Sequence, residues 1–170
     1  MFEVLAFVYE NYWGGDGCPE LPVLQRRLNA VGFDSLEVVE ALLWLEELKN
    51  AARGLLRPIA GPAVPGPVQS ADSLAGWHAS AQAMRVLTGP EQDRLGVAGW
   101  GFVAFLVSVG ALPDDRLELV MERAMAAPDQ TISMEDLKLI VLMVYWSLGE
   151  QPDALVLDEL CDNRVLRLAN

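Results

Sequence analysis

Histidine and cysteine are almost absent from this chain. His78 is the only histidine, and Cys18 and Cys161 are the only cysteines. Zinc ligation and general acid–base catalysis ordinarily need several such side chains close together. The two thiols are far apart in the sequence and neither has a CxxC partner, so reduced cysteines are expected. We therefore expect no metal, no cofactor and no enzymatic activity, with His78 exposed in a loop.

Basic residues are also few. The chain has 12 Lys and Arg against 24 Asp and Glu, which gives a formal net charge of −12 at pH 7. Such a chain repels nucleic-acid phosphates and anionic membranes, and it favours basic or apolar protein surfaces. The N-terminal segment has an acid at position 3, Glu3, and lacks the basic region of a signal peptide. These features predict a cytoplasmic protein with a protein partner.

Two long stretches carry no charge at all. Leu95–Pro113 is close to the length of about 20 residues that crosses a bilayer, but its glycines dilute its hydrophobicity, so we expect a buried soluble helix. Leu139–Leu148 is uncharged and mostly apolar on every side of a helix, which is typical of the middle of a packed core. Ser133 can cap this second helix and Gly149 can end it.

Helix-capping and helix-terminating residues, with apolar residues at helical spacing between them, predict a mainly α fold. In residues 1–53 we expect a three-helix module with helices over Phe2–Trp13, Pro22–Val31 and Asp34–Lys49. In residues 88–170 we expect a helical bundle with helices over Glu91–Val109, Asp114–Ala126, Met134–Leu148 and from Pro152 to about Cys161. Gly32 can end the helix over Pro22–Val31, and candidate caps are Asp34 with Glu37, and Thr88 with Glu91.

Residues 54–87 form a Pro/Gly-rich connection that excludes regular helix over most of its length. Two arrangements of this connection fit the sequence. It is either a long loop, or it contains a small β-hairpin in which Leu55–Arg57 pairs with Met84–Leu87. The hairpin would make the N-terminal module winged-helix-like.

Six segments of the sequence resemble those of a known family: MFEVLAFVYENY, LNAVGFDSLEVVEALLWLEEL, RVLTGPEQDRL, GFVAFL, MERAMA and MEDLKLIVLMV. Together they resemble the Smg family of proteobacterial proteins, over essentially the whole chain except residues around 61–82. The phrases around Ala41–Leu45 and Asp136–Lys138 are the most specific. The resemblance implies a cytoplasmic protein of unknown function, without a membrane span, since relatives carry charges in the segment that matches Leu95–Pro113. It also implies a gene that commonly lies beside that of a DNA-processing protein.

One face of the expected helix over residues 34–49 is acidic and contains a tryptophan. At 100° per residue this face contains Glu37, Glu40, Trp44 and Glu47. An exposed tryptophan among acids is typical of an interface anchor that selects a basic partner. The alternative is that Trp44 packs against the C-terminal bundle of the same chain. On the first interpretation these four residues form a partner-binding site of an adaptor protein.

Nucleic-acid association is the second functional hypothesis. In a winged-helix layout the helix over residues 34–49 would enter the major groove, but its acids would be repelled by phosphates. The basic residues that would have to gather instead are Arg26, Arg27, Arg57 and Arg85. Nothing in their spacing predicts that they do, so nucleic acid is the less favoured partner.

Overall fold

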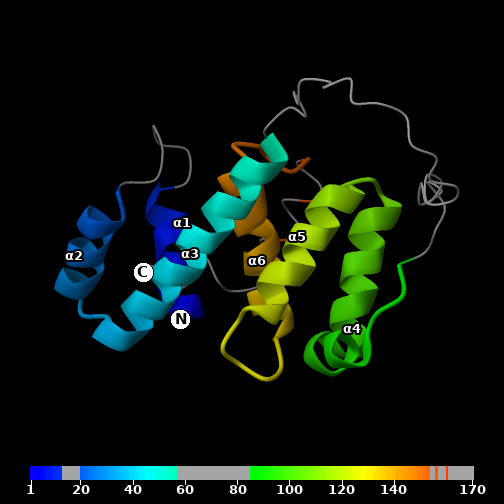
Figure 1. Cartoon of the computed structure of the whole chain (residues 1–170), viewed down its shortest axis with the longest axis horizontal. Coiled ribbons are helices and arrows are strands. Elements are labelled where there is room, and N and C mark those ends of the chain that lie inside the picture. Colours follow the sequence, from blue (N-terminus) through cyan, green and yellow to red (C-terminus); the bar gives the residue numbers. More distant parts are fainter. Residues whose placement is uncertain (13–19, 57–84, 154–155, 157–159, 161–170) are drawn as a thin grey trace, which may run out of the picture.

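The computed structural model describes residues 1–12, 20–56 and 85–153, together with Val156 and Leu160. Six helices follow one another along the described residues: α1 (Phe2–Tyr12), α2 (Leu21–Val31), α3 (Ser35–Leu56), α4 (Gly89–Ser108), α5 (Asp114–Met125) and α6 (Met134–Ser147). Helix α2 lies at one end of the molecule and α4 at the other, with α3, α5 and α6 between them (Figure 1). The prediction of a mainly α fold is confirmed.

Helix α6 is the centre of the core, as its uncharged sequence predicted. Every residue from Leu137 to Tyr145 is buried, and these residues include Lys138, whose ammonium lies 5.5 Å from the ring centroid of Phe102. The predicted end signals are also confirmed. The Ser133 hydroxyl accepts a hydrogen bond from the Asp136 amide at 3.1 Å, and Gly149 has a φ of 70°.

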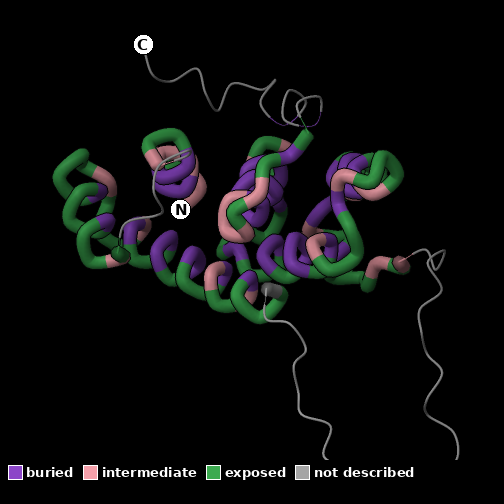
Figure 2. Tube along the Cα trace, turned by 90° about the horizontal axis from the view of Figure 1, so that it is seen from above, coloured by how far each residue is buried: buried purple, intermediate pink, exposed green. Residues whose placement is uncertain are grey.

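Both halves of the chain contribute to one core. Helices α1 and α3 pack against α6, and α3 also packs against α5. Buried residues, drawn in purple, turn toward the middle of the helix array (Figure 2). Of the predicted seventh helix, four residues are described: Pro152 and Asp153 are not helical, whereas Val156 and Leu160 are helical and buried in this core. The rest of that helix lies outside the described residues.

The predicted β-hairpin is wrong for the residues that the structure describes. Leu55 and Leu56 belong to α3, which continues seven residues past Lys49 because Ala51, Ala52 and Arg53 are strong helix formers. Residues 85–87 are not a strand, and no strand occurs elsewhere in the described ranges. The winged-helix-like arrangement is therefore not supported, while residues 57–84 lie outside the description.

Helix α4 is bent at Gly96, whose φ of 64° lies in the left-handed region that favours glycine. The carbonyl of Arg94, two residues before the bend, accepts a hydrogen bond from the Ile132 amide at 3.0 Å. Past the bend, a Cβ on Gly99 would lie 3.3 Å from Leu137, so this glycine permits close packing of α4 on α6. No helix in the described part of the chain is long and apolar enough to cross a membrane.

Candidate interaction surface

Helix α3 is positioned by a tight turn from α2. Gly32 ends α2 with a φ of 108°, and its amide donates to the carbonyls of Leu28 and Asn29. The Asp34 carboxylate then caps α3 by accepting a hydrogen bond from the Leu36 amide at 2.8 Å. Both signals were predicted from the sequence, so the start of α3 follows from local rules.

Trp44 does not lie on an exposed face of α3. Its side chain is only 3% exposed, and its indole N–H donates a hydrogen bond of 3.1 Å to the carbonyl oxygen of Arg123 in α5. That carbonyl belongs to the last turn of α5, where the helix cannot supply a partner of its own. The structure therefore matches the alternative in which Trp44 packs against the C-terminal bundle, and its assignment as an exposed partner anchor is corrected.

Arg123 completes the contact between α3 and α5. Its guanidinium is buried and forms ion pairs of 2.9 Å with Glu47 of α3 and with Glu122 of its own helix. Both carboxylates remain largely open to solvent, so they pair with a buried cation without being buried themselves. Glu47 thus has a structural contact that the sequence analysis did not foresee.

The side of α3 predicted to be buried is wrong, because the prediction left out the small residues that also lie in the core. Ala41 and Ala52 are each 1% exposed, and they bring the buried side around toward Trp44. Leucine and valine alone suggested a buried centre on the other side of the helix, rotated by roughly a quarter turn. Counting alanine as apolar would have moved the expected buried side toward the observed one.

The outer side of α3 therefore presents apolar residues to solvent. Leu36, Val39 and Leu43 are 67%, 48% and 56% exposed, and their spacing of three and four residues places them in one row. Acidic side chains flank the row on both sides: Glu40 and Glu47 on one, Glu46 on the other. We call these six residues the α3 outer face, and its exposed side is visible along α3 in Figure 2.

The third predicted acid, Glu37, lies at the edge of this face. The Glu37 carboxylate is 4.0 Å from the N-terminal ammonium of Met1 and is about half exposed. Glu40 remains exposed, as the acidic-face prediction requires, while Glu47 is shared with Arg123. The three predicted acids thus lie on one side of α3, but Trp44 among them is buried, and the exposed aliphatic row lies beside them.

The three predicted arginines that the structure describes do not gather into one basic surface. Arg26 donates to the Pro22 carbonyl within α2, and Arg27 donates to the Tyr12 hydroxyl at 3.2 Å. Arg85 precedes α4 at the opposite end of the molecule from α2 (Figure 1). Arg57 lies outside the described residues.

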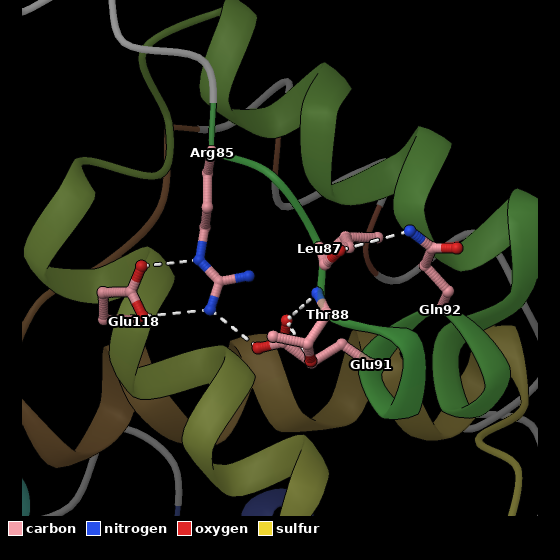
Figure 3. A network of polar contacts seen from close by, with 6 residues as sticks. All are labelled: Arg85, Leu87, Thr88, Glu91, Gln92 and Glu118. Carbon is pink, nitrogen blue, oxygen red and sulfur yellow. Dashed lines mark hydrogen bonds and ion pairs between the residues drawn. The ribbon is translucent and has the colours of Figure 1, made fainter.

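Arg85 is held in a network of its own (Figure 3). Its guanidinium forms two hydrogen bonds with Glu118, at 2.6 and 3.1 Å, and a third with Glu91 at 2.8 Å. The other oxygen of Glu91 accepts hydrogen bonds from the Thr88 amide and hydroxyl, which caps α4 as predicted. These contacts, that of Arg85 first, lower the pKa of Glu91 to about 2.

The Glu91 network makes stability depend on pH. Because the folded-state pKa lies below the ordinary value of 4.5, the contribution is complete above about pH 4.5 and is lost as the pH falls toward 2. We expect Glu91→Gln to remove roughly 2 kcal/mol from the free energy of unfolding at pH 7, after allowance for partial solvent screening. The difference from the wild-type chain should vanish near pH 2 in urea titrations. Asp93→Asn, an exposed acid of the same turn, is the control; an equal pH profile for both variants would contradict the assignment.

No cluster of three or more metal-ligating side chains occurs within the described ranges. His78, Cys18 and Cys161 all lie outside them. The acidic pairs Asp114–Asp115 and Glu135–Asp136 sit in the first turns of α5 and α6. There they face the positive end of the helix dipole, which accounts for their position.

Comparison with known proteins extends the sequence resemblance over the whole chain. Residues 1–168 match a family model described as "Protein of unknown function (DUF494)". A "Protein Smg homolog" from Methylibium petroleiphilum is 48% identical over 94% of this chain and 93% of its own. The chain belongs to the Smg family. Smg homologs from Leptothrix cholodnii and Bordetella pertussis are 45% and 37% identical, over 94% and 96% of this chain and 93% and 95% of their own.

No solved structure matches the chain. The family is one of unknown function, so the Smg relatives assign no activity to the α3 outer face. The function has to be argued from the surface itself.

Proposed function

We propose that this protein is a non-enzymatic, cytoplasmic interaction module that binds a basic and partly apolar protein surface through the α3 outer face. The observation that carries the proposal is the exposed row Leu36, Val39 and Leu43. Single exposed aliphatic residues are ordinary on protein surfaces, but a continuous row on one helix is typical of a contact surface. An amphipathic helix of a partner fits such a row.

The charges of the face select the partner. Glu40 and Glu46 are exposed on opposite sides of the row, and the whole chain has a net charge of −12. Acids around an apolar centre attract a basic partner and disfavour acidic ones. The same acids would repel nucleic-acid phosphates, which supports a protein partner over nucleic acid.

The test uses a defined probe, a fluorescently labelled amphipathic helical peptide made of leucine and lysine. We expect the full chain to bind it, and Leu43→Ser to weaken binding about tenfold because one buried leucine is lost from the contact. Glu40→Lys with Glu46→Lys should weaken it further. Fluorescence anisotropy measures the dissociation constants, and circular dichroism checks that each variant is folded.

A matched charge control separates this surface from general attraction. Asp93→Lys with Glu135→Lys makes the same change in net charge at exposed positions on α4 and α6. That variant should retain most of the affinity, since charges farther away than about 10 Å are largely screened at 0.1 M salt. Equal losses in the two charge variants, or an unchanged dissociation constant for Leu43→Ser, would rule out the α3 outer face as the binding surface.

A further inference from the structure

The segment before the bend in α4 is joined into one piece by its own polar contacts. We call residues 85–94 the α4 arm; it consists of the non-helical residues before α4 and the first turns of the helix. Hydrogen bonds tie these two parts together (Figure 3): Arg85, the Thr88 amide and the Thr88 hydroxyl donate to Glu91, and the Gln92 side chain donates to the Leu87 carbonyl. The arm can therefore move without losing its internal structure.

The α4 arm buries very little apolar surface against the rest of the protein. Among residues 85–94, Glu91 is the only buried residue, and Leu87 is the only apolar one that is half-buried. Val86 is 84% exposed. Apolar burial supplies most of the free energy that holds an element in place, so a segment with so little of it opens at a lower cost than the core.

Polar contacts at its two ends hold the arm on the rest of the protein. At one end, the Arg85 guanidinium donates to both oxygens of Glu118 in α5, at 2.6 and 3.1 Å. At the other end, the Arg94 guanidinium donates to two backbone carbonyls in the connection between α5 and α6, each at 2.7 Å. The Arg94 carbonyl accepts a hydrogen bond from the Ile132 amide in the same connection. Water can replace each of these contacts when the arm moves away.

Gly96 gives the arm a hinge. Its φ of 64° and ψ of 178° interrupt the helix in a conformation that favours glycine, and no atom lies within 4 Å of the position of a Cβ. Leu95, at the hinge, is buried and packs against Gly99 of the same helix, so the fixed part of α4 begins there. We propose that the α4 arm opens as a unit about Gly96 while the rest of the protein stays folded.

The Ile132 amide reports this opening, because its hydrogen-bond acceptor is the Arg94 carbonyl of the arm. Amide hydrogen exchange followed by NMR measures its protection factor in the full chain. We expect a protection factor at least about 100-fold below that of Ile140, which is fully buried in α6 and exchanges only on global unfolding. Equal protection at the two positions, falling in parallel with added urea, would overturn the proposal.

Glu118→Gln tests whether the two ends of the arm move together. It removes the charge that holds Arg85 and leaves the contacts of Ile132 unchanged. If the arm opens as a unit, protection of Ile132 should fall about threefold, the value of one partly exposed ion pair. Independent fraying of the Arg94 end predicts no change at Ile132, and that result would overturn the proposal.

Glu122→Gln is the matched control on the same helix. It removes an ion pair of 2.9 Å with Arg123, which does not touch the arm. Any loss of global stability should then lower the protection of Ile140 but not that of Ile132, because this ion pair stays intact when only the arm opens. An equal fall at Ile132 in the Glu118 and Glu122 variants would contradict opening of the arm as a unit.

Gly96→Ala tests the hinge. An alanine is strained at a φ of 64°, and opening of the arm relieves the strain, so we expect the protection of Ile132 to fall at least about tenfold. Gly101→Ala is the control: it lies on the same helix, has no positive φ, and has room for a Cβ. It should leave Ile132 unchanged. Equal protection of Ile132 in the two alanine variants would show that Gly96 is not the hinge.

Discussion

Replacing Trp44 with alanine should lower the free energy of unfolding by about 4 kcal/mol, the cost of emptying a large buried site. The side chain is 3% exposed between α3 and α5. Its loss also leaves the Arg123 carbonyl without the indole N–H that satisfies it. Urea unfolding followed by far-ultraviolet circular dichroism measures the change. An adaptor site centred on Trp44 would instead predict an unchanged fold.

Two further variants separate the components of this effect. Trp44→Phe keeps most of the ring volume but loses the hydrogen bond, so we expect a smaller loss of roughly 1–2 kcal/mol. Leu43→Ala, at the adjacent but exposed position, should change stability by no more than about 0.5 kcal/mol. Equal effects at positions 43 and 44 would show that the assigned orientation of α3 is wrong.

The second large effect is expected in the middle of α6. Ile140 is fully buried on a helix that is covered on every side from Leu137 to Tyr145. Ile140→Ala should cost about 3–4 kcal/mol, and Ile140→Val about 1 kcal/mol, in the free energy of unfolding. The two variants are compared because the loss of unfolding free energy should increase with the side-chain volume removed. A cost below about 1 kcal/mol for Ile140→Ala in urea unfolding would contradict the central position of α6.

The sequence predicts best where a local rule determines the structure. Ser133, Gly149, Gly32 and Asp34 end or cap helices as expected, because their conformational and hydrogen-bonding preferences act over a few residues. The burial of α6 was also predictable, since an uncharged helix leaves no side for solvent.

The sequence predicts poorly where several neighbours compete for one helix. Helix α3 contacts α1, α2, α5 and α6, so its broad apolar surface exceeds what the core can cover. Packing then decided that Trp44 lies inward and Leu43 outward. The side-chain pattern of a single helix does not contain that information.

Ion pairs between segments that are distant in the sequence could not be predicted either. Arg85 meets Glu118 and Arg123 meets Glu47 only because α5 lies between α3 and α4. From sequence alone Arg85 was a free cation, available to a phosphate. In the fold it is already neutralised by two carboxylates.

Helix α3 is divided into a buried side that holds Trp44 and an outer face that, as we propose, binds a basic partner. The most direct measurement is a map of backbone and indole amide chemical shifts of the ¹⁵N-labelled chain during titration with the leucine–lysine peptide. We expect saturable shifts concentrated from Leu36 to Glu47, with the Trp44 indole N–H still protected from solvent exchange. Shifts spread evenly over all acidic surfaces, or a Trp44 indole that exchanges freely before the peptide is added, would contradict it.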